Sequence, residues 1–411
     1  MTEFSATSCV RAAVATDTSH GAVIPPLHLS TNFTFKGLGE RRQYDYTRSG
    51  NPTRDQLAET LAELEGGHGA IVTSSGMAAL TAIVHLVDAG QVIIAPHDCY
   101  GGTFRLLAAL DKQGRTRVRF VDQGDHQALA HAFKEGDVGL VLVETPSNPL
   151  LRVVDIARVS DLCRQHGALL VADNTFLSPA LQRPLTLGAD LVVHSTTKYI
   201  NGHSDVVGGA VIAKTPELAQ QLTWWANCLG ITGAPFDSFL TLRGVRTLPA
   251  RIRLHEENAG AIASFLAEAP GIAKVYYPGL ASHPGHEIAK KQQSGFGGII
   301  SFELQGGLAA VKAFTDGLKY FSLAESLGGV ESLIAHPSSM THASMTPEAQ
   351  ARAGITASLL RISVGIEAKE DLLQDLCLGL ERAARATSHS TYSKSPERER
   401  ADRHDTCSTA V

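Results

Sequence analysis

A single lysine follows an apolar, β-branched run near the middle of the chain. The run Leu191, Val192 and Val193 predicts a buried strand, and "HSTTK" brings Lys198 just beyond the end of that strand. Burying an ammonium group is costly unless its charge is paired or given up. Lys198 therefore requires a chemical reason for its position.

Two other predicted strand ends carry polar groups. Asp173 is the single charge at the end of the apolar stretch "LLVAD". Gly76 and Met77 stand where a strand passes into a helix, and the free N–H groups and helix dipole there suit a phosphate. The hydroxyls of Ser195 and Thr197 add further phosphate contacts. Each signal is weak alone, because turns and helix caps use the same residue types.

Together these groups meet the three requirements of pyridoxal 5′-phosphate. This cofactor needs a lysine for its Schiff base, an anion that keeps its ring nitrogen protonated, and donors for its phosphate. Lys198, Asp173 and the groups near Gly76 would supply them. A desolvated lysine beside a cationic ring would have a lowered pKa and could move protons. The sequence therefore predicts a pyridoxal-phosphate enzyme.

An α/β domain would bring these residues together. From residue 56 to residue 245, apolar strands such as "QVIIAP" alternate with amphipathic helices such as "FRLLAALDKQG". This alternation predicts a mainly parallel sheet, whose ligands bind beyond the carboxyl ends of its strands. The first helix is expected to start at a capping box formed by Thr53 and Gln56.

The remainder of the chain divides into three segments. We expect residues 1–55 to form an arm without a core of its own, and residues 246–385 to form a smaller α+β domain. The polar residues 386–411 are expected to be a disordered tail without a catalytic part. The predicted fold class is therefore α/β, with a large pyridoxal-phosphate-binding domain and a smaller C-terminal domain.

Composition argues against several classes of protein. The 411 residues carry a net charge of −5 without a basic stripe, so no nucleic-acid partner is expected. No apolar stretch is long enough to cross a membrane, and the six scattered cysteines are typical of reduced thiols in the cytoplasm. A GxGxxG fingerprint after a strand is absent, and the histidine pairs lack a third ligand at a useful spacing. We therefore expect neither a nicotinamide cofactor nor a metal.

Longer motifs resemble the Cys/Met-metabolism family of pyridoxal-phosphate enzymes, of fold type I. They include "DYTRSGNPTRDQLAETLAELEGG", "APHDCYGGTFRLL", "VETPSNPLLRVVDIA" and "SLAESLGGVESLIAHPSSMTH". The resemblance implies that Lys198 forms the Schiff base, that Asp173 holds the ring nitrogen, and that Tyr100 stacks on the ring and assists proton transfer. It also implies that Tyr46 and Arg48 reach the cofactor phosphate of a neighbouring subunit, in a homotetramer built from two dimers.

The same resemblance implies a set of substrate-binding residues. Arg361 would clamp the α-carboxylate through its guanidinium, and Asn148 and Ser326 would orient the same end of the substrate. Glu325 would receive the distal amino group of cystathionine or cysteine. Arg105 is a candidate partner for the distal carboxylate of a succinyl group.

The implied reaction is γ-replacement, as in methionine biosynthesis by transsulfuration. Cysteine would displace the acyl group of an O-acylhomoserine to give cystathionine, with Lys198 moving protons at Cα and Cβ. Ser49 stands where succinyl-using members carry a second arginine, so the acyl group stays open between succinyl, which we favour, and acetyl. The family's cystathionine γ-lyases share Glu325 and Lys198, but motifs such as "WWANCLGITG" favour synthesis.

Overall fold

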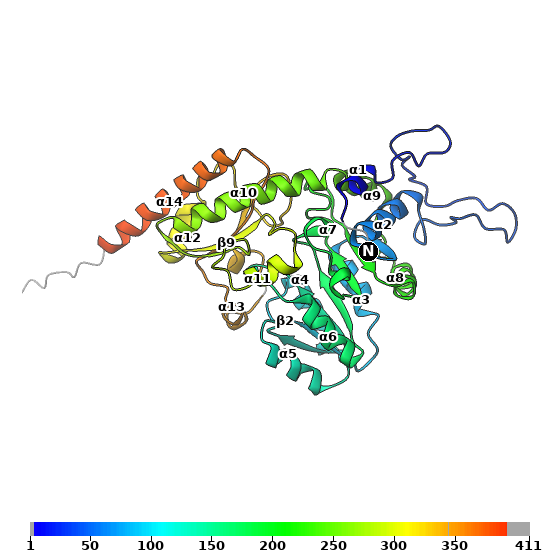
Figure 1. The fold of residues 1–411 in the computed structure, drawn as a ribbon, viewed down its shortest axis with the longest axis horizontal. Coiled ribbons are helices and arrows are strands. Elements are labelled where there is room, and N and C mark those ends of the chain that lie inside the picture. Colours follow the sequence, from blue (N-terminus) through cyan, green and yellow to red (C-terminus); the bar gives the residue numbers. More distant parts are fainter. Residues whose placement is uncertain (1–3, 344, 393–411) are drawn as a thin grey trace, which may run out of the picture.

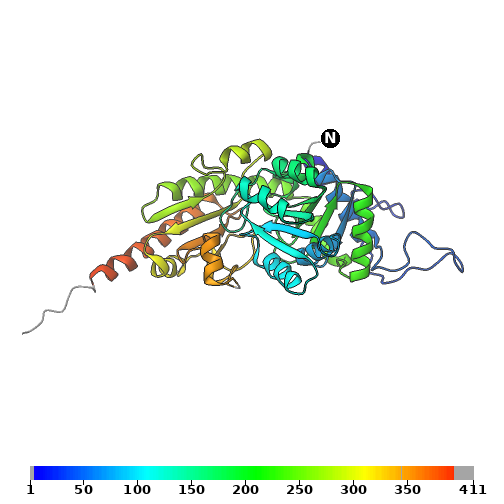
Figure 2. The ribbon, with the colours of Figure 1, turned by 90° about the horizontal axis from the view of Figure 1, so that it is seen from below.

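The computed structural model describes residues 4–343 and 345–392. Figure 1 shows a larger and a smaller part joined by the long helix α10 (Leu248–Glu268). Part of the N-terminal arm projects from the end of the molecule opposite α14 (Lys369–Tyr392), as Figure 2 also shows. Within the described ranges, no helix is long and apolar enough to span a membrane.

The larger part is built on a seven-stranded sheet with the order β1-β7-β6-β5-β4-β2-β3. Strand β7 runs antiparallel to its two neighbours, and the other neighbouring pairs are parallel. This mainly parallel sheet confirms the predicted fold class. In sheet order the strands are Gly69–Thr73, Gly209–Ala213, Leu191–His194, Leu169–Asp173, Val138–Glu144, Val92–Pro96 and Arg117–Val121.

Both faces of this sheet are buried, which explains the continuous apolar runs of its strands. In β6, Val192 packs into the core on one face and Val193 into the core on the other. One face is covered by α2 (Pro52–Glu65), α5 (His126–Ala132), α6 (Ile156–His166) and α9 (Pro235–Val245). The other is covered by α3 (Gly76–Val84), α4 (Gly101–Lys112) and α8 (Pro216–Leu229).

The predicted capping box of Thr53 and Gln56 was wrong, because α2 begins two residues earlier. Asn51, rather than Thr53, is the N-cap, and its side chain accepts the N–H groups of Thr53 and Arg54. Pro52 occupies the first helical position, where its fixed φ and missing N–H carry no cost. The proline therefore sets the start of the helix.

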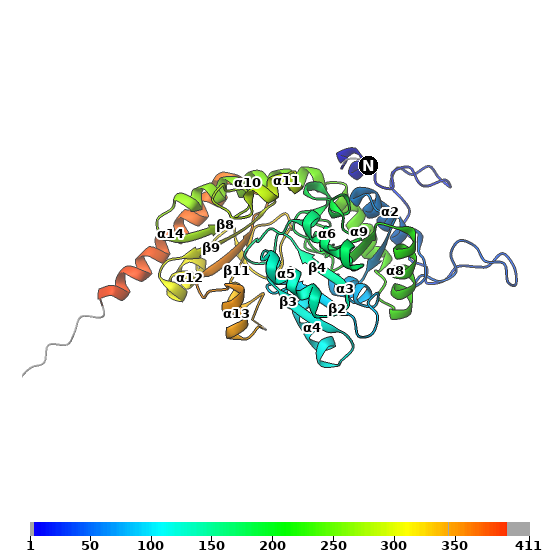
Figure 3. The ribbon, with the colours of Figure 1, turned by 60° about the horizontal axis from the view of Figure 1, so that its bottom comes forward.

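The smaller part contains a five-stranded sheet of order β10-β11-β12-β9-β8, seen in Figure 3 beside α12 and α14. Apolar side chains of α10, α12 (Gly307–Thr315) and α14 form one core with the central strands of this sheet. Helix α14 continues past residue 385 to Tyr392, and residues 393–411 of the expected tail lie outside the described residues. In sheet order the strands are Ser322–Leu323, Leu333–Ala335, Leu359–Ser363, Ile299–Leu304 and Ile272–Tyr276.

The remaining elements are short. They are the helices α1 (Ala6–Arg11), α7 (Ser178–Leu181), α11 (His286–Gln292) and α13 (Pro347–Ala353), and the 3₁₀ turns Phe133–Glu135, Pro184–Leu187 and Pro337–Ser339. Residues 12–50 form projecting loops held by a few backbone contacts, such as the bridge between Asn32 and Tyr46. Val23, Leu29 and Leu38 are exposed on these loops. Such exposure is typical of segments that pack against another molecule.

Candidate active site

A cavity of about 450 Å³ lies at the carboxyl ends of β4, β5 and β6, between the two parts of the molecule. Its volume is in the range of small-molecule sites, and its position is the one expected for a parallel sheet. The structure brings most of the predicted site residues to this cavity. Those that line it are Gly76, Met77, Tyr100, Asn148, Asp173, Ser195, Thr197, Lys198, Glu325, Ser326 and Arg361.

Lys198 lies partly buried in the cavity wall, where its Nζ donates to Ser326 Oγ at 2.6 Å. Burial and, to a lesser extent, the nearby Arg361 cation lower the pKa of Lys198 to about 8, against an opposing effect of Glu325. More of the amine is therefore neutral near physiological pH than in an exposed lysine. A neutral amine is the form that attacks an aldehyde.

Residues 326–328, which belong to the smaller part and include the Ser326 partner of Lys198, pack closely against the backbone of Lys198 and Tyr199. Gly328 has a φ of 77°, and a Cβ at this position would lie 2.7 Å from Tyr199 N. Ser326 has a φ of 83°, which is uncommon for a residue with a side chain. The glycine and the strained serine together bring this segment against the end of the lysine loop.

Two carboxylates lie side by side at the bottom of the cavity. Asp173 and Glu144 are the last residues of neighbouring strands and pair in register. Asp173 Oδ1 accepts the Thr175 N–H at 3.0 Å. Burial raises the pKa of Asp173, and burial together with the Asp173 charge raises the pKa of Glu144 to about 8. With Glu144 largely protonated near neutral pH, the negative charge of the pair would rest on Asp173, where it is complementary to a protonated pyridine nitrogen.

The N-terminus of α3 closes another side of the cavity. Ser75 caps it by accepting the Ala78 N–H at 3.1 Å, and the first N–H groups of a helix have no helical acceptor. A Cβ on Gly76 would lie 3.0 Å from Ser195 Cβ, so the glycine lets the helix approach the end of β6. Thr197 Oγ1 already bonds Gly208, donating to its carbonyl and accepting its N–H. The helix N-terminus and Ser195 thus form an anion cradle.

Tyr100 lies at the mouth of the cavity, directly before α4, and is 44% exposed. Its N–H donates to Glu144 Oε2 at 2.9 Å. A Cβ on Gly102 would lie 2.6 Å from Tyr100 Cε1 and 2.8 Å from Met77 Sδ. The ring therefore borders the N-terminal end of α3, on the side of the cavity that the anion cradle forms.

Arg361, on β12, is a buried cation with one unused donor. It donates to Asn148 Oδ1 at 3.0 Å and to the Ser326 carbonyl at 2.7 Å. Its Nε has no hydrogen-bond partner among the described residues. Burial lowers the pKa of Arg361 to about 10, which leaves the guanidinium charged at neutral pH. Glu325 is exposed and lines the cavity near this end.

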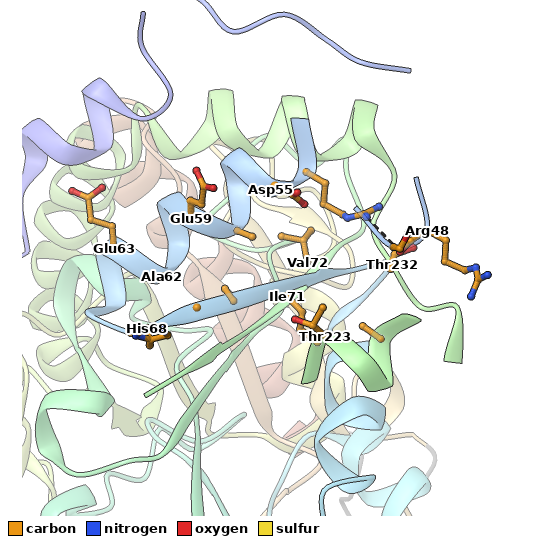
Figure 4. Close-up of a pocket in the computed structure, with 17 residues that line it drawn as sticks. Arg48, Asp55, Glu59, Ala62, Glu63, His68, Ile71, Val72, Thr223 and Thr232 are labelled. Carbon is orange, nitrogen blue, oxygen red and sulfur yellow. Dashed lines mark hydrogen bonds between the residues drawn. The ribbon is translucent and has the colours of Figure 1, made fainter. Parts of the chain in front are cut away.

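Three predicted residues lie outside the cavity within one chain. Arg105 is exposed on α4 and does not line it. Tyr46 is exposed on the arm, and Arg48 donates to the Asn227 carbonyl at 2.9 Å and to Asn227 Oδ1 at 3.0 Å on α8. Arg48 lines a second cavity, of about 540 Å³, between α2, β1 and α8, and Figure 4 shows it at one end of that cavity.

The residues of the main cavity fit pyridoxal phosphate. A lysine of lowered pKa, an anionic spot and an anion cradle surround one space, and the unused Arg361 Nε suits a substrate carboxylate. Sequence reasoning missed Glu144 and Thr175, which also line the cavity. Their signal was available, because Glu144 ends an apolar strand in the same way as Asp173 and Thr175 follows Asp173 closely.

Comparisons with known proteins agree with a pyridoxal-phosphate cofactor. A family model described as "Cys/Met metabolism PLP-dependent enzyme" matches residues 6–381. The chain is 56% identical over 388 residues to cystathionine gamma-synthase of Escherichia coli K12, covering 93% of this chain and 99% of that protein. It is 48% identical over 376 residues to cystathionine beta-lyase of Lactococcus lactis subsp. cremoris, covering 92% and 98%.

A solved structure shows the same relationship. The crystal structure of cystathionine gamma synthase from Xanthomonas oryzae pv. oryzae in complex with cystathionine is 61% identical to this chain. It covers 93% of this chain and 98% of its own, with a TM-score of 0.92. The overall fold described above is therefore that of this relative.

Proposed function

Because the chain belongs to the Cys/Met metabolism family of pyridoxal-phosphate-dependent enzymes, we propose that it joins cysteine to an O-acylhomoserine to form cystathionine. The observation that carries the proposal is the order of similarity among relatives. Two cystathionine synthases are 56% and 61% identical to this chain, above the 48% of a cystathionine beta-lyase and the 46% shared by a cystathionine gamma-lyase and a third synthase. The synthase of known structure was also solved with cystathionine bound.

The residues of the cavity have distinct proposed tasks toward the cofactor. When bound, pyridoxal phosphate supplies an electron sink for the charge left when a proton leaves Cα of the substrate. Lys198 would hold its aldehyde, and Asp173 would keep its ring nitrogen protonated. The N–H groups of Gly76 and Met77 would bind its phosphate with Ser195.

Other residues would bind and orient the substrate. Arg361 would clamp the α-carboxylate with its unused Nε, while Asn148 fixes the orientation of the guanidinium. Lys198, released from the cofactor, would move protons at Cα and Cβ, because a pKa of about 8 allows it both to accept and to donate near neutral pH. Glu325 would receive the amino group of cysteine.

We propose that the acyl group is succinyl, with acetyl as the alternative. Arg105 lies on α4, which begins beside Tyr100, and its charge suits the distal carboxylate of a succinyl group. An acetyl ester lacks that carboxylate. Purified enzyme with cysteine should convert O-succinylhomoserine faster than O-acetylhomoserine, as measured by mass spectrometry of cystathionine. Arg105→Ala should raise KM for the succinyl ester by about tenfold and leave KM for the acetyl ester unchanged. Faster turnover of the acetyl ester would overturn this assignment.

We propose that the active assembly is a homotetramer of two dimers, with the active sites shared within each dimer. Tyr46 and Arg48 would reach the cofactor phosphate of the neighbouring subunit. This role would explain why both residues lie on an exposed arm and do not line the cavity of their own chain. A cytoplasmic location is also proposed. The five cysteines in the described part of the chain are all free thiols, which suits a reducing compartment.

A further inference from the structure

Glu144 is a buried carboxylate that the proposed reaction does not use. It ends β4, lines the cavity, and is 7% exposed. Its oxygens accept hydrogen bonds from two separate loops. Oε2 accepts the N–H of Tyr100 at 2.9 Å, and Oε1 accepts the N–H of Asn148 at 2.9 Å.

Each of these loops presents one side of the cavity. Tyr100 precedes α4 and has no side-chain cap of its own, so its backbone is held by Glu144. Asn148 accepts a hydrogen bond from Arg361 through its Oδ1. One carboxylate therefore fixes both the aromatic ring at the cavity mouth and the amide that orients the guanidinium.

The chemical type of Glu144 is costly at this position. A second carboxylate beside Asp173, away from water, is disfavoured by desolvation and by like-charge repulsion. The two N–H donors bond different oxygens, Oε2 and Oε1, and a glutamine would place an NH₂ group, which cannot accept, at one of these two positions. The two backbone contacts therefore explain why a glutamate stands where glutamine would fill the same space.

We propose that Glu144 is a positioning residue that couples the placement of Tyr100 over the cofactor to the placement of Asn148 against Arg361. It acts through these two residues and contacts no reacting atom. The inference rests on the roles proposed above for Tyr100 and Asn148. It adds a residue that links cofactor stacking to recognition of the substrate carboxylate.

The test uses the Glu144→Gln holoenzyme and two readouts that need no turnover. Visible circular dichroism of the bound cofactor reports the placement of the ring. Titration with glycine, followed by the change in visible absorbance, reports α-carboxylate binding by a ligand without a leaving group. We expect a changed dichroic band and a rise of about tenfold in Kd for glycine, because the NH₂ group of glutamine cannot accept one of the two backbone N–H groups.

Asp375→Asn is the matched control. Asp375 is 4% exposed on α14 and also accepts backbone N–H groups, those of Lys319 and Tyr320, and none of these three residues lines the cavity. This variant should lower Tm and leave the dichroic band and the glycine Kd unchanged. Glu144→Gln with a lower Tm but wild-type values of both readouts would overturn the proposal.

Glu144→Asp carries the same test if the glutamine variant does not fold. It keeps the charge but is one methylene shorter, so both contacts are weakened and the same two changes are expected. Failure of both variants to fold, while Asp375→Asn folds, would make Glu144 a residue that the fold itself requires and would contradict the proposal. Glycine binding does not depend on cystathionine synthesis, so failure of the proposed function is separately visible.

Discussion

Lys198 shows how surroundings select the protonation state of one amine. Its Nζ has a hydroxyl partner, Ser326, and the Arg361 cation lies close enough to lower its pKa further. Both neighbours come from the smaller part of the molecule. The reactivity of this lysine therefore depends on residues more than a hundred positions away in sequence.

The pH dependence of cofactor uptake should report this pKa. Apoenzyme mixed with pyridoxal phosphate should gain its visible band about tenfold faster per pH unit from about pH 6, and then level off near pH 8, as neutral amine saturates. An α-acetyl-lysine control, measured at each pH, corrects for titration of the cofactor itself. A rate that keeps rising through about pH 9.5 would indicate an ordinary lysine and contradict the account.

At the scale of elements, α2 is tied to the strand ends that carry the site. Glu65, its last residue, is fully buried and accepts hydrogen bonds from His194 Nε2 at 2.6 Å and from Asn174 Nδ2 at 2.9 Å. Asn174 directly follows Asp173 and His194 ends β6. The helix therefore fixes β5 and β6 from the face opposite the cavity.

Removing this carboxylate should destabilise the larger part. Glu65→Ala should lower the free energy of unfolding by about 3 kcal/mol, because it leaves buried polar partners unpaired. Glu63→Ala on the same helix is the control, since Glu63 is exposed, and it should change the value by less than about 0.5 kcal/mol. Denaturant unfolding measures both. Equal effects of the two substitutions would show that the Glu65 contacts do not stabilise the fold.

Helix α10 carries a buried histidine, His255, that should make the free energy of unfolding depend on pH. His255 Nδ1 lies 2.7 Å from the Val364 carbonyl, its Nε2 has no partner among the described residues, and burial lowers its pKa to about 4. An unfolded histidine binds a proton near pH 6.5, so this residue stabilises the fold above that pH and the contribution is lost as pH falls toward 4.

His255→Asn tests this term, because the asparagine amide can keep the contact to Val364 without titrating. The Tm advantage of the wild type over this variant should shrink as pH is lowered from about 7 to about 5. A constant Tm difference across that range would show that His255 has the same pKa in the folded and unfolded states.

At the scale of the whole molecule, the sequence predicted the larger part better than the smaller one. Asp173 and Lys198 follow apolar strands, and parallel strands bring such ends to one edge, so local pattern was enough. Nothing local indicates that Arg361, in the smaller sheet, faces the same cavity; only the family resemblance suggested it. Glu144 ends its strand in the same way as Asp173, so the same local pattern could have identified it.

The proposed sharing of active sites through the N-terminal arm can be tested by mixing two variants. Lys198→Ala and Arg48→Ala should each be inactive or strongly impaired alone. Unfolded together and refolded as a mixture, they should recover about a quarter of wild-type activity, because half of the random dimers contain one site with both residues intact. Mixing without recovery, although both variants refold into oligomers, would show that Arg48 serves its own chain.

The direction of the reaction is the central claim, and one assay tests it. Enzyme is given cysteine with an O-acylhomoserine in one tube and cystathionine alone in another, with Lys198→Ala as the blank, and products are followed by mass spectrometry. We predict rapid formation of cystathionine, slow loss of added cystathionine, and neither reaction in the variant. Breakdown of cystathionine to cysteine, 2-oxobutyrate and ammonia, with no use of either ester, would contradict the account and identify a lyase built on the same site.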